Sequence, residues 1–146
     1  MLMGEYHHNI DEKKRLVIPS KFRSELGNKF IITRGLEKCL FVYSEKEWNK
    51  IIDELNTLPF TRKDVRCFTR FFLSGAVLSE IDQLGRVSIT SPLIEYAEIN
   101  KECVIIGAND HLEIWALESW NKFVEENIDS LSTVAESLFK GGFNAL

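Results

Sequence analysis

The same sequence pattern occurs twice along the chain, and this duplication constrains the fold more than any other feature. Residues 10–26 (IDEKKRLVIPSKFRSEL) align with residues 81–97 (IDQLGRVSITSPLIEYA) at an offset of 71. We therefore expect two similar units, residues 1–73 and residues 74–146. After one inserted residue the match resumes at an offset of 72 in two further pairs: LFVY (40–43) with LEIW (112–115), and WNKII (48–52) with WNKFV (120–124).

Each unit predicts a β-hairpin whose first strand ends at an aspartate, Asp11 or Asp82, and whose second strand begins at an arginine four residues later. The loop of the second unit ends in Gly85. Three-residue hairpin loops favour glycine there because the backbone turns left-handed. The aspartate is well placed to accept hydrogen bonds from N–H groups of the turn. The first unit has Lys14 at the glycine position, so a matching loop would hold this lysine left-handed at a cost of about 1 kcal/mol.

The rest of each unit also follows one order of elements. Short helices come after the hairpins, and we expect Ser20 and Ser91 to be their N-caps and Gly27 to end the first helix. Ser44 is predicted to cap a further helix. The other expected elements are the strands 30–34, 39–43, 103–107 and 112–116, a helix that opens at 61–64, an acidic helical segment from Trp120 towards Leu138, and a terminal coil at 141–146.

These elements predict an α+β protein with two similar β-rich halves. A unit of about 70 residues buries little apolar surface, so a single copy would be marginally stable. We therefore expect the two tandem βα-repeats to pack together around a pseudo-two-fold axis.

The composition is that of an ordinary globular protein, because the 146 residues are 45% hydrophobic and 27% charged. No run approaches the roughly 18 apolar residues that span a bilayer, and the first residues lack a secretory signal, so we expect a cytoplasmic protein. The spacing of Cys39, Cys67 and Cys103 suits neither a zinc site nor a redox pair and favours buried thiols. The matching positions of Trp48 and Trp120 predict that both tryptophans belong to the core.

Charge is distributed unevenly between the two units, although the whole chain carries a net charge of −4. Residues 1–73 hold 14 of the 18 lysines and arginines and 10 of the 22 acids, a net of +4, whereas residues 74–146 have a net of −8. Five of the fourteen bases fall between Lys13 and Arg23. This asymmetry indicates that the region around the first hairpin faces an anion.

Several motifs now identify a family. They are G-E-Y-x-x-x-I-D at 4–11, the paired D-x-x-x-R motifs at 11–15 and 82–86, R-x-F-x-R-F-F at 66–72, and EIW at 113–115 followed by Trp120. With these motifs, and with the doubled pattern at a spacing of about 70 residues, nearly the whole chain resembles the MraZ family of bacterial transcriptional regulators.

The resemblance implies an AbrB-like swapped-hairpin β-barrel with flanking helices, built from two repeats in one polypeptide. It also implies a ring-shaped homo-oligomer that binds short promoter repeats upstream of the division and cell-wall gene cluster. The DNA-contacting element of the family corresponds to Asp11 with Arg15 and to Asp82 with Arg86. This chain departs from the pattern at Lys14, where the family usually has glycine.

Two interpretations of the paired arginines stay open. Arg15 and Arg86 could each bind guanine through O6 and N7, because a planar guanidinium makes two parallel hydrogen bonds there. Alternatively, each pairs with the aspartate four residues earlier, and a paired arginine can still touch DNA. For Arg15 we favour DNA contact because lysines precede it, whereas for Arg86 neither interpretation is preferred. Asp11, Asp82 and Gly85 would orient the loops.

Other cations in this region suit contacts with phosphate groups, which fix register and supply salt-sensitive affinity. The alternative is a solvated charged face, and the regional excess of positive charge favours phosphate contact. The residues concerned are Lys13, Lys14, Lys21 and Arg23.

A second basic stripe consists of Arg62, Arg66 and Arg70. We expect it to pair with acids of the second unit rather than with DNA, in the same subunit or in a neighbouring one. Such head-to-tail contacts close into rings when the rotation permits. The acidic candidates are Glu118, Glu125, Glu126 and Asp129.

No motif indicates catalysis, a metal or a cofactor. Nucleophile-elbow, phosphate-loop and H-E-x-x-H spacings are missing from the sequence, and His7, His8 and His111 have no cysteine-rich partner segment. We therefore expect no enzyme, no cofactor, no small-molecule substrate and no membrane partner. The expected function is sequence-specific binding of double-stranded promoter DNA by a nucleoid-associated regulator. The alternative is a ring-forming structural or protein-interaction module without specific DNA readout.

Overall fold

The structure is a computed structural model that describes residues 1–139, so the coil expected at 141–146 lies outside the described residues. The first part of the chain contains β1 (Leu2–Asn9), β2 (Arg15–Val17), α1 (Ser20–Leu26), β3 (Lys29–Arg34), η1 (Leu36–Lys38), β4 (Leu40–Ser44), α2 (Glu45–Asn56) and α3 (Lys63–Ser74). The second part contains β5 (Val77–Glu80), β6 (Arg86–Ser88), α4 (Ser91–Tyr96), β7 (Glu102–Asn109), β8 (Leu112–Ala116), α5 (Leu117–Asn127), η2 (Ile128–Ser130) and α6 (Leu131–Leu138). This order confirms the expected α+β class.

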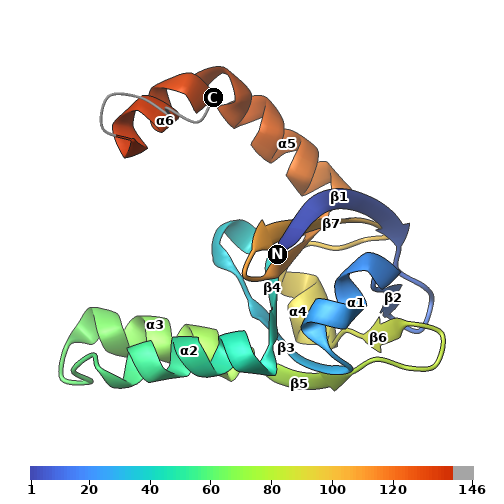
Figure 1. Cartoon of the computed structure of the whole chain (residues 1–146), viewed down its shortest axis with the longest axis horizontal. Helices are drawn as coiled ribbons and strands as arrows, with labels where there is room; N and C mark the ends of the chain where they lie inside the picture. Colours follow the sequence, from blue (N-terminus) through green and yellow to red (C-terminus); the bar gives the residue numbers. More distant parts are fainter. Residues whose placement is uncertain (140–146) are drawn as a thin grey trace.

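The sheets are built by exchange of strands between the two repeats (Figure 1). Six antiparallel strands lie in the order β1-β7-β8-β4-β3-β5, and β2 pairs separately with β6. The first strand of each repeat pairs with the other repeat, because β1 lies beside β7 and β5 lies beside β3. The strand order therefore has the pseudo-two-fold symmetry of an interlocked swapped-hairpin fold.

The core collects apolar side chains from both repeats into one cluster. It includes Leu16 of β2, Phe22 of α1, Val87 of β6 and Leu93 of α4, none of which is more than 2% exposed. Leu16 and Val87 are direct partners across the β2–β6 pair. The short two-stranded ribbon is consequently held against the body of the protein by its inner face.

The N-caps of the short helices differ from the expectation. Ser20 and Ser91 are the first helical residues, and the cap positions belong to Pro19 and Thr90, neither of which makes a side-chain capping bond. The expected caps were therefore wrong by one residue. The N–H groups of Ile18 and Ile89 still donate across the ribbon, to the carbonyl oxygens of Gly85 and Lys14, so only one residue separates the ribbon from each helix. Gly27 ends α1, as predicted.

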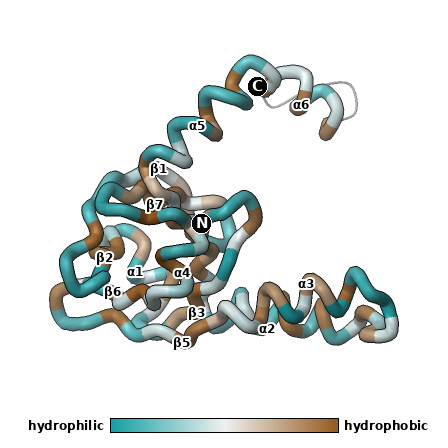
Figure 2. Tube along the Cα trace, turned by 180° about the vertical axis from the view of Figure 1, so that it is seen from behind, coloured by the Kyte–Doolittle hydropathy of each residue, from teal (hydrophilic) through white to brown (hydrophobic). Residues whose placement is uncertain are grey.

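Two helical arms project from the body. The α2–α3 hairpin and the α5–η2–α6 segment both leave it on the side away from β2 and β6 in the two opposite views (Figures 1 and 2). Ser44 caps α2 as expected, because its Oγ accepts a hydrogen bond from the N–H of Glu47 at 3.2 Å. No helix in residues 1–139 is long and apolar enough to cross a membrane.

Packing at the arms corrects two expectations about buried residues. Trp48 and Trp120 are only half-buried; Trp48 stacks on Phe72 at 5.4 Å between ring centroids, and Trp120 packs edge-on against Trp115. The predicted burial of all three cysteines is wrong for Cys67, which is exposed on α3, whereas the other two are buried. Both errors arise because the arms extend into solvent rather than folding back over the sheet.

The contact between β1 and β7 is close enough to require glycine at position 107. Gly107 lies opposite Gly4, and a Cβ atom on Gly107 would collide with the backbone of Leu2 and Met3.

We predict that Gly107→Ala lowers the free energy of unfolding by roughly 1–3 kcal/mol, as for other overpacked sites. Chemical denaturation measures this change. Met3→Ala, which shortens an exposed side chain on the partner strand β1, is the control, and equal stabilities of the two variants would contradict the prediction.

Candidate nucleic-acid interface

The two D-x-x-x-R motifs lie on one small β-ribbon. Because β2 and β6 are antiparallel and begin directly after the two loops, the loops flank the ribbon at opposite ends. Side chains alternate along a strand, so burial of the central residue of each strand turns its neighbours outwards. Arg15 and Arg86 are therefore on the same outward face. The cross-strand pairs are Arg15 with Ser88, Leu16 with Val87, and Val17 with Arg86.

The first loop, which we call tip 1 (residues 11–15), is organised by the carboxylate of Asp11. Its Oδ1 accepts hydrogen bonds from the N–H groups of Lys13 at 2.9 Å and Arg15 at 2.8 Å, and its Oδ2 accepts one from Nε of Arg15 at 2.8 Å. Lys14 has φ 61°, which confirms the left-handed conformation expected from the repeat. A lysine thus occupies a backbone conformation that glycine adopts with less strain.

The second loop, tip 2 (residues 82–86), has the same hydrogen bonds. Asp82 Oδ1 accepts from the N–H groups of Leu84 at 2.9 Å and Arg86 at 2.8 Å, and Oδ2 accepts from Nε of Arg86 at 2.8 Å. Gly85 has φ 77°. The expected role of the aspartate as acceptor for the turn is confirmed in both loops.

Each arginine is paired with its aspartate and remains accessible. The side chains of Arg15 and Arg86 are 28% and 26% exposed. In each ion pair the guanidinium uses only Nε, and within residues 1–139 its two terminal nitrogens have no hydrogen-bond partner. The carboxylate thus fixes the direction of the guanidinium and leaves its outer edge available to a ligand.

Hydrogen bonding also shifts the acidity of the two aspartates. The pKa of Asp11 lies below its ordinary value chiefly because its carboxylate accepts a hydrogen bond from the backbone N–H of Arg15. Burial is the next contribution and opposes this shift, but the guanidinium of Arg15 and the N–H of Lys13 also lower the pKa, so the net shift is downward. The pKa of Asp82 is lowered in the same way by Arg86. Both carboxylates therefore stay ionised at neutral pH.

One contact at tip 2 comes from the first repeat and was not foreseen from the sequence. The guanidinium of Arg23, on α1, lies directly against Gly85, where any Cβ atom would collide with it. Nε of Arg23 donates to the carbonyl oxygen of Ile18 at 2.8 Å, which holds the side chain in place. The swapped arrangement thus carries a cation from the basic repeat to the loop of the acidic repeat.

The same contact explains the difference between Gly85 and Lys14. At an offset of 71, the repeat position of Arg23 is Ile94, which is buried in the core. Tip 1 consequently has no equivalent arginine against it in the described part of the chain, and a side chain at Lys14 has room. Glycine adopts the positive φ of tip 2 with little strain, and any larger residue at position 85 would displace the guanidinium of Arg23 from its present place.

The remaining predicted cations are free to meet a ligand. Lys13, Lys14 and Lys21 are exposed, and none makes a side-chain hydrogen bond or ion pair with another described residue. Both lysines of tip 1 lie next to Arg15, whereas Lys21 lies in the first turn of α1. The structure therefore brings cations to the ribbon, to its two ends and to the adjoining helix.

The basic stripe on α3 makes other contacts within the chain. Arg62 pairs with Asp64 at 2.8 Å, Arg66 donates to the carbonyl oxygens of residues 60 and 61, and Arg70 lies over the ring of Phe60. Among residues 1–139 none of them pairs with an acid of α5 or η2. The pairing expected with the second unit is therefore not made within this subunit.

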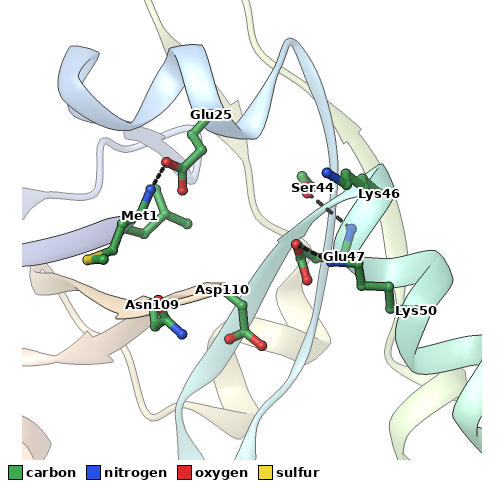
Figure 3. Close-up of a pocket in the computed structure, with 9 residues that line it drawn as sticks. Met1, Glu25, Ser44, Lys46, Glu47, Lys50, Asn109 and Asp110 are labelled. Atoms are coloured by element: carbon green, nitrogen blue, oxygen red, sulfur yellow. Dashed lines mark hydrogen bonds and ion pairs between the residues drawn. The ribbon is translucent and has the colours of Figure 1, made fainter.

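A polar cleft of about 720 Å³ lies elsewhere on the surface (Figure 3). Its charges are of both signs and are partly paired, because the amino group of Met1 contacts Glu25 and Glu47 accepts a hydrogen bond from Lys50 at 3.1 Å. This cleft lacks the single sign of charge that would attract a phosphate backbone. It is lined by Met1, Leu2, Glu25, Ser44, Lys46, Glu47, Lys50, Asn109 and Asp110.

Two of the three histidines, His7 and His111, contact carboxylates. His111 contacts Asp110 through Nδ1 at 2.7 Å and Glu113 through Nε2 at 2.9 Å. Burial opposes its charged form, but these two acceptors outweigh burial and raise the pKa of His111. His7 contacts Glu5 at 2.7 Å. No group of three or more metal-ligating side chains forms within residues 1–139.

Comparison with known protein families matches the chain twice to the same family model. The family model described as "MraZ protein, putative antitoxin-like" matches residues 1–71 and again residues 72–141. Each matched segment contains one D-x-x-x-R loop of the ribbon.

We predict that acid destabilises the protein partly through the two loop aspartates. Folding lowers their pKa values, so they stabilise the folded state above their ordinary pKa of 3.8, and this stabilisation is lost as pH falls through the lowered values. Thermal unfolding should show a smaller loss of Tm on acidification from pH 6 to pH 2.5 in the double variant Asp11→Asn/Asp82→Asn than in the wild type.

Asp53→Asn is the control for this measurement, because Asp53 is exposed on α2 and makes no hydrogen bond among the described residues. Its acid profile should follow that of the wild type. Parallel profiles of the double variant and the wild type would show that the loop carboxylates do not contribute.

Proposed function

Because the chain belongs to the MraZ family, we propose that it is a sequence-specific DNA-binding transcriptional regulator that acts on a bacterial promoter. The observation that carries this proposal is the pair of aspartate-braced arginines on the outward face of the β2–β6 ribbon. From the resemblance, we further propose that its targets are short repeats upstream of the division and cell-wall gene cluster, and that the protein is nucleoid-associated in the cytoplasm.

The geometry of the ribbon suits the major groove of B-DNA, which admits a two-stranded antiparallel β-ribbon. Arg15 and Arg86 hold their Nε atoms on carboxylates, so their terminal nitrogens are available for O6 and N7 of guanine. The brace also limits the rotamer freedom that binding would otherwise remove. In this proposal Arg15 is the principal base contact and Arg86 is a second one.

Phosphate contacts would come from the cations around the ribbon. Lys13 and Lys14 extend from tip 1, Lys21 lies on α1, and Arg23 lies against tip 2. Such contacts position the protein on the duplex and make its affinity depend on salt. Residues 1–73 thus supply most of the DNA-contacting surface, although Arg86 belongs to the second repeat.

One subunit offers few contacts, so we propose that several subunits bind successive repeats as a ring-shaped homo-oligomer. Linked binding sites raise the effective local concentration and therefore the affinity. The projecting arms support self-association. Exposed apolar side chains lie on both arms: Leu58, Phe60, Phe68, Phe71, Leu73, Val124, Ile128, Leu131, Val134 and Leu138. Charge complementarity between the basic stripe of α3 and the acids of α5 and η2 would orient neighbouring subunits.

We predict that Arg15→Ala weakens binding to the promoter repeat by roughly 1–3 kcal/mol for each base contact, and that it reduces specificity at that base. Lys13→Ala should instead weaken binding to all duplexes by a similar factor and reduce the salt dependence by about one counterion. Fluorescence polarisation with specific and scrambled duplexes distinguishes the two effects. Unchanged specific binding by Arg15→Ala would remove this residue from the interface.

The alternative function, a ring-forming structural or protein-interaction module, makes a different prediction in the same assay. A regulator shows a steep salt dependence together with a large ratio of specific to nonspecific affinity. A module without DNA readout shows weak binding that is independent of sequence. Salt titration with the protein's own upstream DNA therefore decides between the two functions.

For the oligomer, we predict that Arg66→Glu/Arg70→Glu lowers the native mass, because it places acids opposite the acidic α5 of the neighbouring subunit. Adding Glu125→Arg and Glu126→Arg to this variant should restore part of the mass by reversing the partner charges. Light scattering coupled to size exclusion measures the mass. Lys46→Glu on α2 is the matched control, and an unchanged mass in the arginine variant would count against this interface.

A further inference from the structure

Leu84 is an exposed apolar side chain of tip 2, with 68% of its surface accessible. A single exposed leucine is ordinary in a soluble protein. Its position is what distinguishes Leu84, because the residue is placed by a hydrogen bond of its N–H to Asp82 and lies outside the buried cluster. The side chain is therefore presented to solvent by an ordered loop.

The equivalent residue of tip 1 is Lys13, at an offset of 71. Its N–H donates to Asp11 Oδ1 at 2.9 Å, the same distance as from the N–H of Leu84 to Asp82 Oδ1. The two side chains thus leave equivalent points of equivalent loops. One tip offers an ammonium group where the other offers a branched hydrocarbon, so the two tips cannot make the same contact.

Two arginines belong to the surroundings of tip 2, which contains Leu84. Arg86 follows Leu84 by two residues on the outward face of the ribbon, and Arg23 lies against the adjacent Gly85. A duplex that reached these two arginines would also cover Leu84 and remove water from it. Burial of an apolar side chain is favourable only where it meets another apolar group.

We infer that Leu84 is a specificity-determining residue that contacts the C5-methyl group of a thymine beside the base read by Arg86. The inference rests on the DNA-binding function proposed above. Thymine C5-methyl is the apolar group that base edges present in the major groove, and aliphatic side chains contact it there. Tip 1 has Lys13 at the equivalent place and offers no apolar partner for a methyl group. The two halves of the ribbon therefore read different base pairs.

Replacement of thymine by uracil tests this contact, because it removes only the methyl group. A duplex that the wild-type protein binds specifically is first defined from its upstream DNA, and each thymine is then replaced singly. At one position the replacement should weaken wild-type binding about fourfold, the factor expected for burial of one methyl group. The same replacement should leave the affinity of Leu84→Ala unchanged, because the variant lacks the partner of that methyl.

Leu78→Ala is the matched control, since Leu78 is 64% exposed on β5 and should respond to uracil as the wild type does. The inference is overturned if no single uracil weakens wild-type binding, or if Leu84→Ala loses the same factor as the wild type. In both cases specific binding persists, so the proposed function stands. If the wild-type protein binds no duplex specifically, the proposed function and this inference fail together.

Discussion

Exchange of strands between the two repeats is the constraint on which the rest of the structure depends. Neither repeat keeps its own first strand, because β1 pairs with β7 and β5 pairs with β3. The second strands, β2 and β6, are thereby brought side by side. A repeat folded alone would leave its hairpin without a partner and its apolar face exposed. The same exchange that closes the core also creates the outward ribbon that carries both arginines.

The two tips share a hydrogen-bond pattern but differ chemically. The carboxylate of each aspartate accepts hydrogen bonds from N–H groups of the turn that would otherwise bond to water. The same carboxylate also fixes the side chain of an arginine. Around this common frame, Arg23 lies against Gly85 of tip 2, whereas in residues 1–139 no arginine occupies the equivalent place beside Lys14. The fold is therefore symmetric in its backbone and asymmetric in the surface that a ligand would meet.

The sequence allowed the turn aspartates and the left-handed Lys14 to be predicted, because each depends on residues within one short segment. The expected local hairpins were wrong, since the strands on either side of each loop pair with the other repeat: β1 with β7, β5 with β3, and β2 with β6. The position of Arg23 against Gly85 could not be predicted, since the two residues are far apart in the sequence and meet only through strand exchange. Burial of Cys67 was wrong because the apolar pattern of α3 does not reveal that this helix extends into solvent. The roles proposed for the cations in binding DNA remain predictions.

Strand exchange also resolves an electrostatic difficulty. The second repeat carries a net charge of −8, which by itself would repel a phosphate backbone from tip 2. The segment α5–η2, which carries several acids of this repeat, leaves the body on the side away from β2 and β6 (Figure 1). Arg23 of the first repeat, in contrast, lies against Gly85 of tip 2. In physiological salt, interactions between exposed charges are largely screened beyond about 8 Å. The charges close to a loop therefore determine which ligand it attracts more than the net charge of the whole repeat does. Each tip thus presents cationic side chains in a protein that is acidic as a whole.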